Sequence, residues 1–299
     1  MGDQGPAEGR DMNGIGRYFA RHYLARMNAQ HVRRYPQVVG FAFDLITQDI
    51  HLDGRFDRDY LQFLADRIFP QLLPGGICLD IGANIGNHSM AFAPHFTHVF
   101  AFEPHPRTFR LLELNAELAS NVTALNFGAS DTAGVVQAAH DPLNYAASSI
   151  GKASNAGAIH VEFLLKRVDT VDEISLDAPV TFIKIDVEGH EAAALAGAEE
   201  TIRSNHPLIV LEVLPNEIHA GTSMAVEVLR SYGYQYFYEL CEAGWLSRLP
   251  RNVKKAARSL LTILTARRPS KAGALVKLDR LEKRSYPMLL CSIKPVELH

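Results

Sequence analysis

A carboxylate and two glycines that follow a short apolar run are the first residues of this chain whose spacing could do chemistry. Asp80 ends the run that starts at Gly76, and Gly82 and Gly86 follow before a helical pattern begins. This order is typical of a buried strand that turns tightly into a helix, where glycine permits a close approach and free N–H groups face a ligand. We therefore predict a cofactor-binding turn made by Asp80, Gly82, Asn84 and Gly86.

The spacing of this turn favours a nucleoside with an amino-acid part over a dinucleotide. A dinucleotide fingerprint needs a third glycine in the pattern G-x-G-x-x-G, and this chain lacks it. Asp80 would repel a pyrophosphate but attract an ammonium. Glu103 ends the next apolar run, where a carboxylate can accept both hydroxyls of an unphosphorylated ribose. S-adenosylmethionine offers both groups, so we predict it as the cofactor, with Ala129 and Ser130 near its adenine.

A second group of reactive side chains follows another apolar run, 181–185. Asp186, Glu188 and His190 come directly after it, and the carboxyl ends of neighbouring strands should bring them beside the glycine turn. Imidazole has the ordinary pKa that suits removal of a proton from a hydroxyl acceptor near neutrality. We predict His190 as the catalytic base, with Asp186 or Glu188 orienting it or binding the acceptor. A helix-capping or surface histidine is the alternative.

Further polar residues are candidates for contact with the substrate. They are His88, Ser148, Ser149, Glu191 and Glu212. A role in a helix start or a turn is the alternative for His88 and the two serines. Asp186, Glu188, Glu191 and Glu212 could instead collect a divalent metal through oxygen ligands, although hydrogen bonds to a polyol would use the same acids.

Alternating strand and helix patterns position these motifs. Strands are predicted at 76–81, 98–103, 122–127, 180–186, 207–213, 234–240 and 287–293, and helices near 87–94, 106–119, 190–204, 222–232 and 252–265. Such alternation favours an α/β fold with a mostly parallel sheet covered on both faces. Before it, we expect an amphipathic helix over 17–34 as a lid or dimer helix, an edge strand within 41–50 and a helix over 57–69.

Length and composition suit one large domain with additions. The chain has 299 residues, of which 47% are hydrophobic, and a net charge of −3. We predict a disordered N-terminus over 1–16, an N-terminal helical cap over 17–70, and an enzyme domain over 71–299. No run approaches the ~18 apolar residues that a membrane span needs, and no signal-peptide pattern is present, so a cytoplasmic location is expected.

A basic insertion over about 246–285 departs from this ordinary composition. Residues 248–284 contain twelve Lys or Arg and two acids. Such a segment could meet nucleic acid, an anionic membrane surface or a phosphorylated substrate, and a solvated charged face is the alternative. No aromatic residues interleave the basic ones, which weakens the nucleic-acid interpretation.

Four motifs in a fixed order give the chain a family resemblance. They are Gly54-Arg55-Phe56-Asp57, the turn Leu79–Ser89, Phe102-Glu103-Pro104 and the segment Ile183–Glu191. With them the chain resembles the FkbM-type methyltransferases over about 41–239. The resemblance implies a Rossmann-like, seven-stranded class I methyltransferase sheet whose last strand runs antiparallel. It also implies O-methylation of a hydroxyl on a sugar, glycan or secondary metabolite, with Asp80, Gly82, Asn84 and Gly86 at the methionyl part and Glu103 at the ribose.

Other functions stay open from the sequence alone. A non-catalytic protein could keep this fold and use the basic insertion on lipid or nucleic acid. An NAD-dependent oxidoreductase is less favoured because of Asp80 and the missing third glycine. The acceptor, a metal requirement and a homo-oligomeric state are not fixed by these motifs.

Overall fold

A computed structural model describes residues 14–141, 144–150, 159–172, 174, 176–241, 253, 257, 270 and 272–298. For 139–141, 144–150 and 159 it describes the backbone only. Residues 1–13 and most of the basic insertion, including the helix predicted near 252–265, lie outside the described residues.

The described chain is built on an eight-stranded sheet. Its order is β11-β10-β12-β9-β8-β1-β2-β3. The strands are β1 (Ile77–Ile81), β2 (His98–Phe102), β3 (Val122–Leu125), β8 (Val180–Ile185), β9 (Leu208–Val213), β10 (Tyr236–Cys241), β11 (Ala274–Lys277) and β12 (Tyr286–Ser292). β3, β2, β1, β8 and β9 pair in parallel, and β12 runs antiparallel to both β9 and β10. The predicted strands and the antiparallel last strand are confirmed.

The sheet has one more strand than the seven predicted. The additional strand, β11, pairs antiparallel with β10 at the sheet edge. It lies inside the predicted basic insertion. A strand was not predicted there because lysines flank the short apolar stretch around Leu275 and Val276. Its four residues are half-buried or exposed, as expected of an edge strand.

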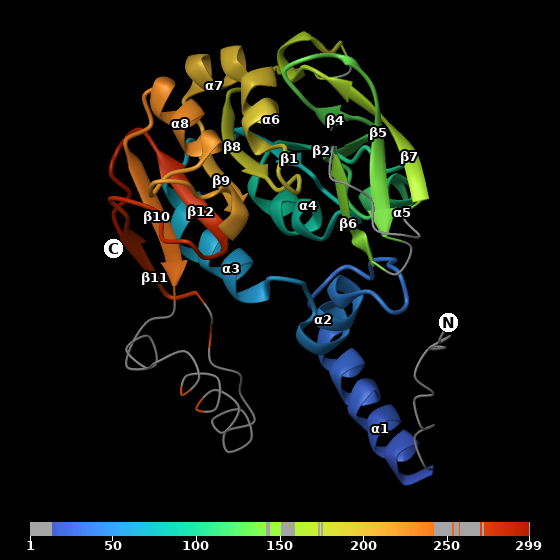
Figure 1. The fold of residues 1–299 in the computed structure, drawn as a ribbon. Helices are drawn as coiled ribbons and strands as arrows, with labels where there is room; N and C mark the ends of the chain where they lie inside the picture. The colour runs from blue at the N-terminus through green and yellow to red at the C-terminus, as the bar shows by residue number, and fades with distance from the viewer. Residues whose placement is uncertain are drawn as a thin grey trace, which may run out of the picture.

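Helices cover both faces of the sheet (Figure 1). One face carries α6 (Glu191–Gly197), α7 (Glu199–Asn205) and α8 (Met224–Ser231), whose apolar side chains pack on Ile77, Leu79 and Ile81. The other carries α3 (Arg58–Phe63), α4 (Asn87–Phe92) and α5 (Pro106–Ala116); Cys78 packs with α3 and α4 there. Successive residues of β1 point to opposite faces and are all buried, so the strand reads as a continuous apolar run interrupted only by Asp80.

A smaller four-stranded sheet lies between β3 and β8 in the chain. It comprises β4 (Gly128–Ala129), β5 (Gly134–Asp141), β6 (Asn144–Ile150) and β7 (Ile159–Lys166) in the order β4-β7-β5-β6. Figure 1 shows it beside the carboxyl end of β2. β4 continues from the third strand of the main sheet, so Ala129 is held near that end.

Two further helices precede the sheet. α1 (Gly14–His31) projects away from the body in Figure 1, and none of its residues is buried. α2 (Leu45–Asp53) occupies the region where an edge strand was predicted, so that prediction was wrong. Ile46 and Thr47 suggested a strand, but Gly54 adopts φ 83° and ends a helix there instead. The division into cap and enzyme domain stays a prediction. Among the described helices, none is both long and apolar enough to cross a membrane.

Candidate functional site

A cavity of about 460 Å³ opens at the carboxyl ends of β1, β2 and β8. Open α/β sheets hold ligands at this edge, and ligand sites typically span ~300–1,000 Å³. Its walls come from the glycine turn, the ends of β2, β8 and β9, the small sheet and the N-terminal segment. They include Asp44, Leu45, Ile46, Phe56, Asp57, Gly82, Asn84, His88, Glu103, Thr108, Ala129, Asp186, Glu188, His190 and Glu212.

The glycine turn is fixed by backbone contacts. Gly82 has φ 79°, and a Cβ atom added there would lie 1.8 Å from the backbone oxygen of Asp186. The N–H groups of Gly82 and Ala83 both donate to the Phe102 carbonyl at the end of β2. Gly86 also has a positive φ, 86°, but it packs beneath Leu112 of α5 and does not line the cavity. Gly82 and Asn84 therefore form the exposed part of the turn.

Glu103 joins this turn to β2. One carboxylate oxygen accepts the N–H of Asn84 at 3.0 Å and the other accepts the N–H of His105 at 2.8 Å. The side chain is buried yet borders the cavity. Burial raises the pKa of Glu103 to about 7, although the two N–H groups and the Lys184 charge act in the opposite direction. Each oxygen keeps a lone pair for a ligand hydroxyl.

Asp80 lies beneath the turn and does not line the cavity. Its carboxylate is fully buried, accepts the Ser89 hydroxyl at 2.5 Å and lies 3.4 Å from the Lys184 ammonium. Lys184 also donates to the Gly82 carbonyl and lies 3.5 Å from Asp186. Lys184 thus supplies a cation beside Asp80, and the predicted contact of Asp80 with a cofactor ammonium stays a prediction.

Lys184 links the two motifs that the sequence separated by a hundred residues. Burial alone would lower its pKa, but the carboxylates of Asp186 and Asp80 raise that pKa overall. Lys184 is not among the site residues predicted from the sequence. A signal was available, since a lysine inside the apolar run 181–185 requires a buried anion nearby.

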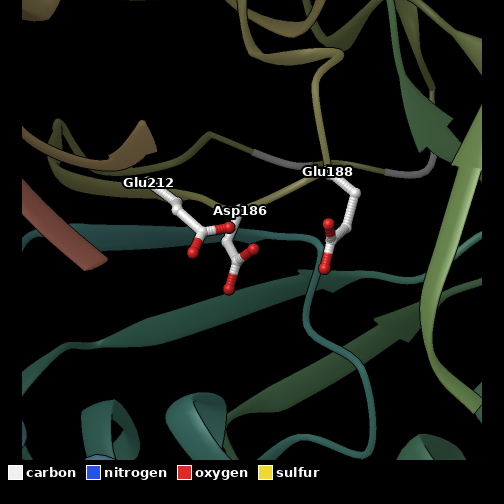
Figure 2. Close-up of side chains that lie close together, drawn as sticks. All are labelled: Asp186, Glu188 and Glu212. Carbon is white, nitrogen blue, oxygen red and sulfur yellow. The ribbon is translucent and has the colours of Figure 1, made fainter. Parts of the chain in front are cut away.

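Three predicted carboxylates gather on one wall of the cavity. Asp186 and Glu188 follow β8, and Glu212 is near the end of β9. Figure 2 shows these side chains close together, and one oxygen from each lies within 4.8 Å of the others. Burial, followed by the charges of Asp186, Glu188 and Glu191, raises the pKa of Glu212 to about 8. Glu212 therefore holds a proton at neutral pH and can donate a hydrogen bond.

Glu191 does not join this group. Its Oε1 accepts the N–H groups of Val187 and Gly189, which closes the turn after β8. It lines a separate cavity of about 410 Å³, which Glu212 also borders. Its position gives Glu191 a structural task at this turn, while the predicted contact with substrate stays a prediction.

His190 lies against the small sheet. Its Nε2 is 3.0 Å from the Ser130 hydroxyl oxygen, and that hydroxyl donates to Asp131 at 3.2 Å. Ser130 is buried and does not line the cavity, and its predicted place near the adenine stays a prediction. Burial lowers the pKa of His190, although the Asp131 charge opposes this. The carboxylate that faces His190 is Asp131, a residue the sequence analysis did not single out.

His88 faces the N-terminal segment across the cavity. Its Nε2 is 3.6 Å from an Asp57 carboxylate oxygen, and its ring meets Phe56 edge-on. The side-chain amide of Asn87 bonds both backbone groups of Phe56, at 3.1 Å each. Asp57 adopts φ 54°, a strained value for a residue with a side chain. Asp57 was visible in the sequence only as part of a family motif.

Ser148 and Ser149 lie in β6, where the backbone alone is described. Their predicted contact with substrate stays a prediction.

Comparison with known proteins shows which protein family this chain belongs to. The profile of the Methyltransferase FkbM domain matches residues 80–236, more than half of the chain. The chain belongs to the FkbM methyltransferase family. It is an S-adenosylmethionine-dependent methyltransferase, as both relatives below are methyltransferases. The nicotinamide-dependent and non-catalytic alternatives are therefore set aside.

Two relatives and one solved structure resemble this FkbM-family enzyme. Hexuronic acid methyltransferase AglP of Haloferax volcanii is 29% identical over 191 residues, covering 62% of this chain and 74% of the relative. The 31-O-demethyl-FK506 methyltransferase FkbM of Streptomyces tacrolimicus is 29% identical over 214 residues, covering 58% and 80%. The crystal structure of methyltransferase FkbM from Methylobacillus flagellatus is 18% identical, with a TM-score of 0.40. The match covers 77% of this chain and 56% of that one.

The polar groups that line the cavity of this FkbM-family enzyme suit S-adenosylmethionine. Glu103 offers acceptors for ribose hydroxyls, and the turn at Gly82 leaves room for a ligand above it. The Thr108 hydroxyl, buried on the cavity wall, has no hydrogen-bond partner among the described residues. A polar atom buried in this way is normally satisfied by a ligand or water.

Proposed function

We propose that this methyltransferase transfers a methyl group to a hydroxyl of a sugar, a glycan or a sugar-like secondary metabolite. The observation that carries the proposal is the trio Asp186, Glu188 and Glu212 on the cavity wall. Neighbouring hydroxyls of a polyol need several acceptors and donors within one small volume, and this trio provides both. The names of the two relatives, which give a hexuronic acid and 31-O-demethyl-FK506 as their substrates, support an oxygen acceptor.

The residues that would hold the cofactor lie along the turn and β2. Glu103 would accept the ribose hydroxyls, Gly82 and Asn84 would border the methionyl part, and Ala129 would lie against the adenine. S-adenosylmethionine supplies a methyl group on a sulfonium, which is already a good leaving group. The protein must therefore align an acceptor and manage its proton, and little else.

The acid trio would orient the acceptor. With a pKa of about 8, raised in part by a hydrogen bond with Asp186, Glu212 would keep its proton at neutral pH and could turn it from Asp186 to an acceptor oxygen. Asp186 and Glu188 would accept hydrogen bonds from neighbouring hydroxyls. Lys184 offsets part of the negative charge through Asp186, 3.5 Å away.

His190 would remove the proton. The Ser130 hydroxyl donates to Asp131, so its oxygen accepts the Nε2–H of His190. This assignment leaves the lone pair on Nδ1 as the basic site. Because burial lowers its pKa, the imidazole is neutral near pH 7 and ready to accept a proton. His88, paired with Asp57, is the second imidazole on the cavity wall and therefore the alternative candidate for the base.

The test is a methyl-transfer screen with labelled cofactor over free sugars, oligosaccharides and hydroxylated metabolites. The proposal expects label on oxygen in at least one of these classes, lost on Glu188→Gln. Label found only on nitrogen or carbon acceptors would contradict it.

A divalent cation on the same trio is a second arrangement, favoured by the 4.8 Å spacing of the three oxygens. We do not prefer it, because the same three acids can bind the neighbouring hydroxyls of a polyol without a metal. Activity lost on EDTA treatment and restored by Mg²⁺ would establish this arrangement.

A further inference from the structure

The N-terminal surface, residues 14–43, has an unusual charge. It contains five arginines and no acidic residue, on a chain whose net charge is −3. The arginines are Arg17, Arg21, Arg26, Arg33 and Arg34. Within the described part of the chain, none of these arginines forms an ion pair with an acidic side chain, whereas Arg203 and Arg230 elsewhere do. A positive field of this kind attracts an anionic partner.

The same surface exposes large apolar side chains. Ile15, Phe19 and Tyr23 are spaced four residues apart on one face of α1 and are 69%, 67% and 54% exposed. Arg17 and Arg21 lie on the opposite side of the helix. Beyond α1, Phe43 is 94% exposed. Large apolar side chains that are exposed together on a protein surface indicate an interaction site.

This surface is attached firmly to the rest of the protein. His31, at the end of α1, lies with Nε2 3.1 Å from the carbonyl oxygen of Leu52 in α2. The guanidinium of Arg55 stacks over the Tyr35 ring, 4.9 Å from its centre. α2 in turn supplies Leu45 and Ile46 to the cavity wall. A partner bound to α1 would therefore lie near the active site.

The positive charge and the exposed apolar side chains of the N-terminal surface together indicate which kind of partner it binds. A second copy of this surface would bring arginines against arginines, with no acid on either side to pair with them. Nucleic acid would pair with the arginines but leave Ile15, Phe19 and Leu24 in water. An anionic lipid bilayer accepts both, since its headgroups pair with arginine and its acyl boundary takes up the apolar face.

We propose that the N-terminal surface docks on an anionic lipid membrane, with α1 lying in the interface. The described part of α1 is not apolar enough to span, which agrees with an interfacial position. Docking brings α2 and the cavity wall that it forms close to the bilayer surface.

The test is flotation of the full-length protein with vesicles of phosphatidylcholine alone or mixed with phosphatidylglycerol. We expect binding only to the mixed vesicles, weakened by salt. R17Q/R21Q/R26Q should lower the affinity by roughly 100-fold, at about 1 kcal/mol per arginine. I15S/F19S/Y23S, which keeps every charge, should also lower it strongly. The control R110Q/K294Q removes exposed positive charges elsewhere on the described surface and should bind like the wild type.

Each of the other outcomes would overturn the proposal. Equal binding to both vesicle types would remove the electrostatic basis. Undiminished binding by R17Q/R21Q/R26Q would assign lipid binding to another segment, such as the basic residues 248–284. A dimer that I15S/F19S/Y23S converts to a monomer in light scattering would show that the surface meets a second copy. Since α1 has no buried residue, the two variants in α1 should keep the wild-type melting temperature.

Discussion

The two edges of the cavity are built in different ways. At the cofactor edge, Gly82, Asn84 and Glu103 are tied together by backbone hydrogen bonds and steric contacts. At the acceptor edge, Asp186, Glu188 and Glu212 come from two strands and meet only through side chains. In the proposed function, the first edge would be rigid and suit one cofactor, while the second could change its acceptor through single substitutions. Family members with different acceptors, such as the two relatives found here, fit this division.

The largest effect is expected from Gly82→Ala at the cofactor edge. The new Cβ would lie 1.8 Å from the Asp186 carbonyl oxygen, and φ is 79°. We expect a loss of about 3 kcal/mol in the free energy of unfolding and no detectable cofactor binding. Denaturant unfolding and calorimetry with S-adenosylhomocysteine measure both.

Gly75→Ala is the matched control for that substitution. Gly75 has nearly the same φ, 78°, but a new Cβ there would meet only Thr97 at 3.6 Å. It should cost about 1 kcal/mol and leave cofactor binding intact. Equal effects at both glycines would mean that backbone strain alone, and not the contact with β8, shapes the turn.

The next effect is expected from His190→Ala. Loss of a general base should lower turnover by about 100-fold or more and leave cofactor affinity near the wild-type value. Ser130→Ala, which removes the hydroxyl that fixes the imidazole, should lower turnover less. Unchanged turnover in His190→Ala, with a large loss in His88→Ala, would move the base to the Asp57 side of the cavity.

Glu103 makes cofactor binding depend on pH. Its pKa in the free protein is about 7, and the ionised form is the better acceptor for two hydroxyls. Cofactor affinity should therefore rise as pH increases from 6 to about 7 and level off above that. Glu103→Gln should bind about 10- to 100-fold more weakly with little dependence on pH. Calorimetry across this range measures both, and a wild-type affinity that falls with pH would contradict the assignment.

A smaller effect is expected from Glu212→Gln at the acceptor edge. The amide still donates a hydrogen bond, so kcat/KM for the acceptor should fall by only about ten-fold, while cofactor affinity stays unchanged. Steady-state kinetics with varied acceptor measures the first, and calorimetry the second. If the cofactor affinity of Glu212→Gln fell together with its kcat/KM, the two edges would not be independent.

The smallest effect is expected from metal removal. Because we assign the trio to hydrogen bonding, dialysis against EDTA should leave turnover within error of the untreated enzyme. A loss restored by Mg²⁺ would instead assign Asp186, Glu188 and Glu212 to a cation.

The difference between the two edges also explains what the sequence could predict. Gly82 and Gly86 were recognisable because a strand-to-helix turn imposes local steric demands that only glycine meets. β1 and β8 were recognisable as apolar runs of the right length. The partners of Asp80 and His190 were not, because Lys184 and Asp131 reach them only once distant strands have paired.

The N-terminal segment shows the same limit. Ile46 and Thr47 favour a strand locally, yet the left-handed Gly54 and the contacts of the segment with α1 make it helical. The position of Phe56 and Asp57 over the cavity depends on Asn87, thirty residues away. No local pattern reports such a contact.

A crystal structure with S-adenosylhomocysteine bound tests the division of the cavity most directly. We predict that both ribose hydroxyls lie within hydrogen-bond distance of Glu103 and that the sulfur faces the wall formed by Asp186, Glu188 and Glu212. A ribose bound away from Glu103, or a sulfur that faces away from this trio, would contradict the account.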